Sequence, residues 1–391
     1  MPEPFEVAIP DETLEDLRGR LERSRFSADF ANEDWRYGTE GGYLRELVDY
    51  WVDGYDWRAE ERAINAVSHF RQEVDGVPIH FIHERGKGPD PMPLILNHGW
   101  PWTFWDFYKV IGPLSDPGAF GGDPADAFDV VVPSLPGFGF SEPLGVTGVN
   151  FSRTAELWLT LMRDVLGYDR FATQGGDWGA LVAEQLGHKY AEHLIGVHLS
   201  LAFPLDFFTA GLPEKEDYAP EEMYRYEQTQ SAFELATSQV VVHSTEPQTL
   251  AFALNDSPLG LCSWIVERRR NYSDCDGDVE RSYTKDELLT GVMLYWVTET
   301  IGTSLRYYWE AKHNPWTPAH DRTPVVEAPT GIALFPRDNC LLPDALLRSY
   351  YNVQQLTEMP SGGHFAPMEE PELFVENVRQ FFRALRDGAD G

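Results

Sequence analysis

Residues 169–186, which read DRFATQGGDWGALVAEQL, decide the fold. The first six residues form a short run typical of a buried β-strand, and ALVAEQL continues as an apolar helix. Between them, Gly175-Gly176-Asp177-Trp178-Gly179 makes a tight turn that carries an acidic side chain. Small residues suit such a turn because bulky side chains would clash with the adjoining strand and helix. The stretch therefore predicts a strand, a sharp turn that presents Asp177, and a helix.

Similar strand-like runs lie on both sides of this stretch, at 93–98, 128–135, 194–201, 330–335 and 352–359. Residues 70–84 read as a hairpin around Asp75-Gly76, which are residues that a two-residue turn favours. Helical stretches separate the runs, and an amphipathic helix is expected at 371–386. This alternation predicts an α/β protein with a mostly parallel, doubly wound sheet.

Two helical blocks interrupt the alternation. The first has helices expected over 11–25, with Asp11 as a candidate N-cap, and over 42–64, and shows no strand pattern. The second block is rich in Trp and Tyr. The sequence therefore predicts four segments, namely a helical N-terminal extension (1–69), a first core segment (70–203), an inserted helical cap (204–318) and a second core segment (319–391).

Composition excludes several classes of function. The 391 residues include 63 acidic and 31 basic side chains, and the net charge of −32 repels nucleic acid and anionic membranes. No apolar run reaches the roughly 18 residues that span a bilayer, and no secretory signal is evident. Three widely spaced cysteines, Cys262, Cys275 and Cys340, indicate a reducing compartment. We therefore expect a cytoplasmic protein without nucleic-acid or membrane partners.

The candidate catalytic residues occur in a fixed order. Asp177 occupies the nucleophile position of a G-x-nucleophile-x-G turn, Asp338 follows a predicted strand, and His364 lies in the loop before the last helix. This order of nucleophile, acid and histidine is that of an α/β-hydrolase triad. The oxyanion hole of such a site uses the backbone N–H after the nucleophile, here that of Trp178, and one from an earlier loop, here that of Trp100 in HGWP.

A carboxylate nucleophile selects the reaction class. It attacks a saturated carbon bearing a leaving group and forms an ester, which water activated by His364 then hydrolyses while Asp338 orients the imidazole. Asp206 is the alternative acid. Epoxides and alkyl halides both fit this chemistry. No cofactor or metal is expected, because the sequence has no P-loop and because His80 and His83 face opposite sides of a strand.

With these residues in place, the chain resembles epoxide hydrolases of the microsomal type in the α/β-hydrolase superfamily, including actinobacterial members. The resemblance covers nearly the whole chain through YDWR (55–58), HGWP (98–101), PSLPGFGFS (133–141), GGDWG (175–179), ALNDSPLGL (253–261), LYW (294–296) and GGHFAPMEEPEL (362–373). It implies an N-terminal meander around core and cap, and cofactor-free hydrolysis of epoxides to vicinal diols. Mammalian members carry an N-terminal membrane anchor, whereas we expect this chain to lack one and to be a soluble bacterial protein. Its oligomeric state stays open, with a homodimer as one alternative.

The resemblance also implies residues that hold the epoxide oxygen, normally two cap tyrosines. Tyr308 matches one of them, but Gln239 stands at the other position, where an amide donates a hydrogen bond without acting as an acid. Tyr307, Trp264 and Tyr295 are further cap candidates, with Tyr307 and Trp264 expected to bind substrate. The aromatic cap predicts an apolar or aryl epoxide. Actinobacterial relatives in natural-product pathways, enediyne biosynthesis among them, share such departures, so a biosynthetic role is also considered.

Two other functions stay open. Trp178 beside the nucleophile is also a feature of haloalkane dehalogenases, where the indole N–H binds halide. The other alternative is a non-catalytic α/β-hydrolase that binds a small molecule as a receptor or scaffold. Diol formation, halide release and binding without turnover distinguish the three.

Overall fold

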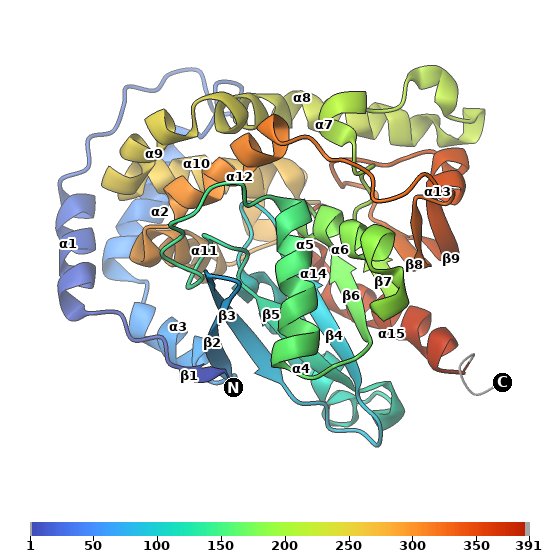
Figure 1. Cartoon of the computed structure of the whole chain (residues 1–391). Helices are drawn as coiled ribbons and strands as arrows, with labels where there is room; N and C mark the ends of the chain where they lie inside the picture. Colours follow the sequence, from blue (N-terminus) through green and yellow to red (C-terminus); the bar gives the residue numbers. More distant parts are fainter. Residues whose placement is uncertain (1, 388–391) are drawn as a thin grey trace.

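The computed structural model describes residues 2–387, and these contain a nine-stranded sheet with the order β1-β2-β3-β5-β4-β6-β7-β8-β9 (Figure 1). The pairs β1–β2, β2–β3 and β3–β5 are antiparallel. All the other pairs, from β5–β4 to β8–β9, are parallel. The strands are β1 Glu3–Phe5, β2 His69–Val74, β3 Val77–Glu84, β4 Met92–Asn97, β5 Phe128–Pro133, β6 Phe171–Gly175, β7 Leu194–Leu199, β8 Val326–Leu334 and β9 Tyr351–Glu358.

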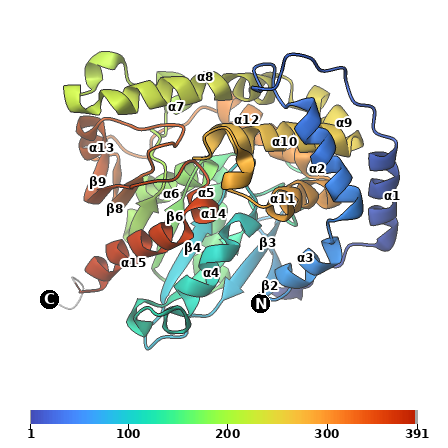
Figure 2. The ribbon, with the colours of Figure 1, turned by 180° about the vertical axis from the view of Figure 1, so that it is seen from behind.

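Helices cover both faces of the sheet, which confirms the doubly wound fold (Figures 1 and 2). One face carries α5 (Phe151–Thr160) and α6 (Trp178–Lys189), and the other carries α4 (Tyr108–Ser115) and α15 (Pro371–Asp387). Every residue of β5 is buried, as expected for a central strand between two helical layers. The strands and the hairpin expected from the sequence are confirmed to within a few residues.

The block of helices between β7 and β8 lies over one end of the sheet (Figure 1). Asp177 directly follows β6 and Asp338 follows β8, so both come from the carboxyl ends of parallel strands, which meet at one edge of the sheet. The helices of the cap are α7 Phe207–Ala210, α8 Met223–Thr245, α9 Pro247–Asp256, α10 Pro258–Tyr272, α11 Lys285–Thr298 and α12 Ile301–His313. The later core segment adds α13 Asp344–Tyr350 and α14 Ala366–Glu369. Residues 388–391, which the expected second core segment also includes, lie outside the described residues.

The N-terminal segment differs from the expectation in three details. It contains a strand, β1, which three residues suffice to form because β2 offers them an open antiparallel edge. The expected helix over 42–64 is two helices, α2 (Gly41–Asp53) and α3 (Trp57–Ile64), because the chain turns and the Asp56 carboxylate accepts a hydrogen bond from the Ala59 N–H. In α1 (Asp11–Glu22), Asp11 is the first helical residue and Pro10 takes the N-cap position.

The same segment joins the core to the cap. Its strand β1 pairs with β2 of the core, and Arg20 of α1 reaches Asp256 of α9 at 2.8 Å. The Tyr50 hydroxyl donates to Asp286 of the cap at 2.8 Å. The segment therefore bonds to both of the other parts of the molecule.

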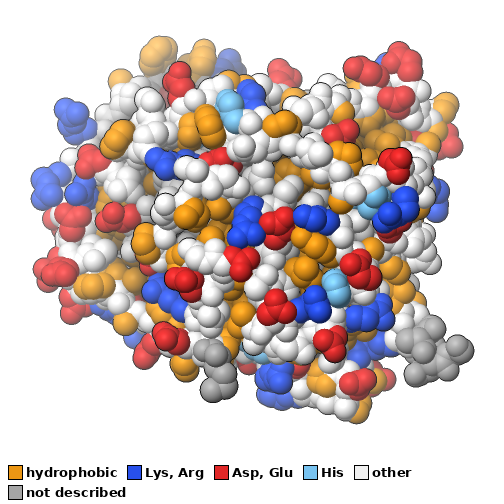
Figure 3. Space-filling model, viewed as in Figure 1, with side chains coloured by type: hydrophobic (Ala, Val, Ile, Leu, Met, Phe, Trp, Pro, Cys, Tyr) orange, Lys and Arg blue, Asp and Glu red, His pale blue; other side chains and the backbone are white. Residues whose placement is uncertain are grey.

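Four structural features bear on membrane, nucleic-acid, metal and disulfide chemistry. No helix within residues 2–387 combines the length and apolar character needed to cross a membrane. Acidic and basic side chains are interspersed on the face shown in Figure 3. His80 and His83 contact different partners, Ser134 and Tyr168, and the described part of the chain contains no cluster of three or more His, Cys, Asp or Glu that could hold a metal. The three cysteines are buried and free.

Candidate active site

Asp177 sits in a strained turn between β6 and α6. Its φ of +51° lies in the region that residues with a side chain rarely adopt. The turn is tight enough to require glycine nearby, because a Cβ on Gly175 would lie 2.0 Å from the Gly179 carbonyl oxygen and a Cβ on Gly179 would lie 2.0 Å from that of Asn97. The helix begins at Trp178, so its positive end is adjacent to the Asp177 carboxylate.

His364 lies between two carboxylates. Its Nε2 is 3.2 Å from Oδ2 of Asp177, and its Nδ1 is 2.7 Å from Oδ1 of Asp338. His364 and Asp338 are both 2% exposed, so water does not screen this contact. The structure thus brings together the three residues expected to form the triad. Asp206, the alternative acid, lies at the start of α7, and the imidazole partner is Asp338.

The two carboxylates hold a proton on His364. Burial lowers the pKa of the imidazole, but the Asp338 charge and the hydrogen bonds to Asp177 and Asp338 outweigh burial and raise the pKa to about 10. The imidazole is therefore protonated at neutral pH.

The loop after β4 holds the other oxygen of Asp177. The Trp100 backbone N–H donates to Oδ1 of Asp177 at 2.7 Å. Gly99 allows this approach, since a Cβ there would lie 2.1 Å from the same oxygen. The His98 Nε2 fixes the loop by accepting from the Leu135 N–H at 2.9 Å. This is the arrangement expected for one oxyanion donor, and Trp178, the other expected donor, adjoins Asp177 with its side chain in the cavity wall.

Tyr308 and Gln239 face each other across the cap. The Gln239 Nε2 donates to the Tyr308 hydroxyl oxygen at 3.3 Å, which leaves the Tyr308 proton free to point elsewhere. The Tyr308 ring packs edge-on against Trp178, with centroids 4.7 Å apart. Burial, and to a lesser extent the Asp177 charge, raises the pKa of Tyr308 well above its usual value. Tyr308 is therefore a neutral hydrogen-bond donor.

A narrow cavity of about 70 Å³ connects the core residues with the cap residues. Asp177, Trp178, His364, Tyr308 and Gln239 all line it. Most of the remaining wall is apolar, and its residues are Leu181, Phe203, Phe207, Phe208, Phe233, Ala236, Val240, Tyr272 and Asn339.

Two residues expected to bind substrate lie outside this lining. Tyr307 points away from the cavity and its hydroxyl is 2.7 Å from that of Thr154, because successive helical residues point about 100° apart and Tyr308 takes the inward position. Trp264 lies behind His243, to whose Nε2 its indole N–H donates at 3.2 Å. Tyr295 likewise donates to the Trp102 carbonyl at 2.8 Å in the core.

Several residues that hold the His364 loop in place were not predicted from the sequence. Glu369 accepts hydrogen bonds from the N–H groups of Phe365 and Asp274, and so joins the His364 loop to the cap. Burial raises the pKa of Glu369 to about 7. The Tyr272 carbonyl oxygen accepts from the His364 N–H at 2.8 Å. One local feature could have indicated these contacts, namely the acidic pair that follows HFAPM in the GGHFAPMEEPEL motif.

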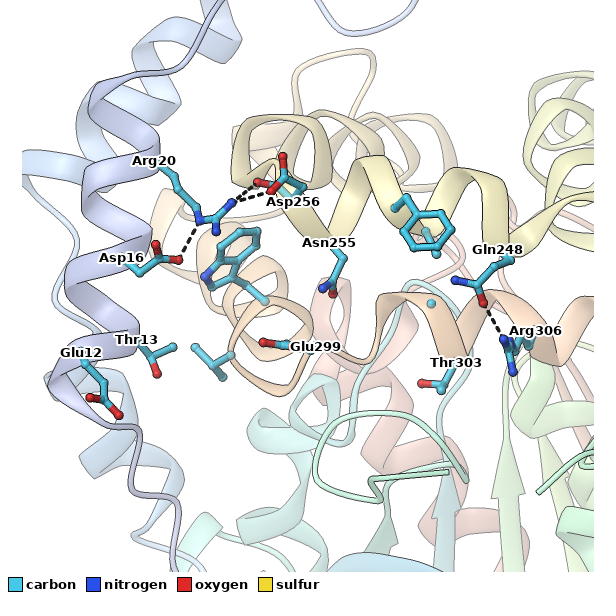
Figure 4. A pocket seen from close by; sticks show the side chains of 15 residues that line it. Glu12, Thr13, Asp16, Arg20, Gln248, Asn255, Asp256, Glu299, Thr303 and Arg306 are labelled. Carbon is cyan, nitrogen blue, oxygen red and sulfur yellow. Dashed lines mark hydrogen bonds and ion pairs between the residues drawn. The ribbon is translucent and has the colours of Figure 1, made fainter. Parts of the chain in front are cut away.

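A larger hollow lies elsewhere, between α1 and the cap helices α9 and α12 (Figure 4). Within it, Arg20 bonds to Asp16 and Asp256, and the Arg306 guanidinium donates to the amide oxygen of Gln248 (Figure 4). It holds none of the triad residues. This hollow therefore lies at the interface, here called the seam, between the N-terminal segment and the cap.

The doubly wound sheet, the strained acidic turn and the histidine between two carboxylates define an α/β hydrolase. A family model for the alpha/beta hydrolase fold matches residues 92–238, and one for the epoxide hydrolase N terminus matches residues 2–107. Epoxide hydrolase 1 of Sus scrofa is 34% identical over 406 residues, which cover 98% of this chain and 88% of that protein. The chain belongs to the epoxide hydrolase family and is an epoxide hydrolase.

Solved structures agree with this assignment. The juvenile hormone epoxide hydrolase of Bombyx mori has a TM-score of 0.86 at 27% identity, covering 99% of this chain and 95% of that chain. The Aspergillus niger epoxide hydrolase has a TM-score of 0.83 at 27% identity, covering 99% and 96%. Both likenesses extend over the cap and the N-terminal segment as well as the core.

Proposed function

We propose that this epoxide hydrolase opens its substrate through an ester of Asp177, which water activated by His364 then hydrolyses to a vicinal diol. The observation that carries the proposal is the placement of the Asp177 carboxylate. One oxygen accepts from the Trp100 N–H, the other faces His364, and both adjoin a cavity lined by Tyr308. No cofactor takes part in the proposed reaction.

In the first step, an Asp177 oxygen forms a bond to an epoxide carbon. The carbon–oxygen bond of the ring breaks, and its electron pair moves to the epoxide oxygen, which takes a proton from the Tyr308 hydroxyl. Gln239 supports this transfer by donating to the Tyr308 oxygen, since that contact leaves the Tyr308 proton free for the epoxide oxygen.

The ester changes the state of His364. Alkylation removes the negative charge of Asp177, which is one of the groups that raise the His364 pKa. The imidazolium then gives up its proton, which returns through solvent to the phenolate left by ring opening. The neutral imidazole takes a proton from water, whose oxygen attacks the ester carbonyl. When the tetrahedral intermediate collapses, the bond between the carbonyl carbon and the substrate oxygen breaks, the diol oxygen takes up the remaining proton of the attacking water, and the Asp177 carboxylate forms again. The Trp100 and Trp178 N–H groups stabilise the tetrahedral oxyanion, while Asp338 stabilises the imidazolium that forms.

The cavity wall supports an apolar, aryl-bearing epoxide as substrate. Phe203, Phe207, Phe208 and Phe233 contribute aromatic surface, and Phe208 stacks on Trp178 with ring centroids 5.6 Å apart. A phenyl group gains contact energy in such a wall, whereas a small polar epoxide gains little. The replacement of a cap tyrosine by Gln239 is the feature on which a role in natural-product biosynthesis rests.

Single-turnover reaction with racemic styrene oxide in ¹⁸O-water tests the mechanism. Ester formation predicts a first-turnover diol with unlabelled oxygen and ¹⁸O in the peptide that carries Asp177. Label in the first diol would mean direct attack by water and would refute the role of Asp177. Halide release from 1-chlorohexane, with no diol from any epoxide, would instead favour the dehalogenase alternative, for which the Trp178 indole lines the same cavity.

A further inference from the structure

Tyr272, the last residue of α10, lines the catalytic cavity. Its side chain is 2% exposed, and its hydroxyl is buried without a hydrogen-bond partner among the described residues. A buried hydroxyl is costly to leave unpaired, so native proteins nearly always pair such groups with protein, water or ligand. The unpaired hydroxyl in the cavity wall therefore marks a position where a bound molecule supplies the partner.

The backbone fixes Tyr272 next to the reacting groups. Its carbonyl oxygen accepts from the His364 N–H at 2.8 Å, and its ring lies edge-on to the His364 ring with centroids 5.8 Å apart. Gly363 permits this contact, because a Cβ there would lie 2.7 Å from the Tyr272 carbonyl oxygen. Movement of Tyr272 would therefore displace the catalytic histidine as well.

The surroundings keep the Tyr272 phenol protonated. Burial is the main cause that raises its pKa, the Asp177 charge adds to the rise, and the opposing Arg268 charge does not cancel it. Gln239, which faces Tyr308, carries no proton that it could transfer. Tyr272 is thus a second neutral phenol, besides Tyr308, in the wall of the cavity that holds Asp177.

We infer that the Tyr272 hydroxyl is a second catalytic acid, which donates a hydrogen bond and shares proton transfer to the epoxide oxygen with Tyr308. This inference rests on the proposed ester mechanism. As the ring bond breaks, the electron pair moves to the epoxide oxygen, and one of the two phenols gives its proton to form the alcohol. The tyrosinate left behind regains its proton through solvent from the His364 imidazolium, which is then neutral and able to take a proton from water.

Single-turnover kinetics on Tyr272→Phe, Tyr308→Phe and the double variant test the inference. With styrene oxide, rapid quench and mass spectrometry follow the ester on Asp177 as it forms and decays. We expect Tyr272→Phe to slow ester formation by about 10- to 100-fold while ester hydrolysis stays within about threefold, and the double variant to be slower than either single variant. Tyr43→Phe is the matched control, since it removes another buried, unpaired phenol oxygen that lies outside the cavity.

Three outcomes would overturn the inference. Unchanged ester formation in Tyr272→Phe would refute it and leave the ester mechanism intact. Slowed hydrolysis with normal ester formation would assign the hydroxyl to the attacking water instead. Absence of any ester in the unmodified enzyme would refute the proposed function and this inference with it. Circular dichroism checks folding, and Tyr272→Trp, which keeps a large ring without an acidic proton, replaces the Phe variant if that variant does not fold.

Discussion

The amide Nε2 of Gln239 donates a hydrogen bond to the Tyr308 hydroxyl oxygen at 3.3 Å, and both side chains are 4% exposed. The amide therefore occupies a lone pair of the phenol oxygen, and this contact leaves the phenol proton free for another acceptor. We expect Gln239 to act through Tyr308 as a positioning residue, and it also contributes to the cavity wall.

Replacing Gln239 by Leu is expected to slow ester formation by about tenfold, because an unoriented phenol loses a hydrogen bond of about 1 kcal/mol and its preferred direction. Ester hydrolysis should keep its rate, which pre-steady-state kinetics can separate. Gln230→Leu on the exposed side of the same helix is the control. Equal rates in Gln239→Leu and the control would show that Tyr308 needs no orientation.

His364→Gln should trap the ester. Ring opening depends on Asp177 and the phenols, whereas hydrolysis needs the imidazole as a base, so the variant should form one ester per enzyme and then stop. Intact-protein mass spectrometry after addition of styrene oxide would detect the added mass. Its absence from Asp177→Asn is the control, and free turnover by His364→Gln would contradict the assigned base.

The pH dependence of stability follows from the same imidazole. The folded-state pKa of His364, about 10, lies above the value of about 6.5 for an unfolded chain, so folding favours the proton. The stabilisation is complete below pH 6.5 and is lost as the pH rises through about 10. Urea unfolding at pH 6, 8 and 10 should show the advantage of the unmodified protein over His364→Gln shrinking as the pH rises. A constant difference would contradict the ion-paired state.

Tyr307→Phe should affect stability and leave catalysis unchanged. The Tyr307 hydroxyl pairs with Thr154 away from the cavity, so its loss should lower the free energy of unfolding by about 1 kcal/mol. Chemical denaturation and steady-state kinetics with styrene oxide measure the two quantities. A large fall in kcat with stability unchanged would restore Tyr307 to the substrate site.

Phe233→Ala should weaken binding of aryl epoxides. Phe233 lines the cavity and is 36% exposed, which places it at the mouth. We expect KM for styrene oxide to rise roughly tenfold and KM for glycidol to change little. Phe252→Ala is the control, because Phe252 is 71% exposed and lies in the seam between the N-terminal segment and the cap. Equal effects on both substrates would argue against an aryl site.

The sequence predicted the features that depend on local geometry. The strained turn at Asp177 has a pattern of flanking glycines because a Cβ at those positions collides with backbone. The order of Asp177, Asp338 and His364 follows from strand ends that meet at one edge of the sheet. The first constraint acts within a few residues and the second follows from the strand order of the fold, so both leave a recognisable pattern in the sequence.

Contacts between distant segments could not be predicted in the same way. Trp264 and Tyr308 both lie on aromatic cap helices, and only the packing of α8 against α10 puts His243 between Trp264 and Tyr308. Tyr272 follows three arginines at the end of a helix and carries no motif. Its role depends on the close approach of Gly363, which lies 91 residues further along the chain.

The attachment of the N-terminal segment to both core and cap has a consequence for the traffic of small molecules. A hinged lid would have to break the β1–β2 pairing or the bonds from Arg20 and Tyr50 at every turnover. The phenylalanine side chains on α7 and α8 line the cavity, and we expect their rotation, a motion of nanoseconds rather than milliseconds, to admit the substrate. The width of the opening between these phenylalanine side chains, more than the movement of a domain, is then expected to determine which epoxides enter and how fast the diol leaves.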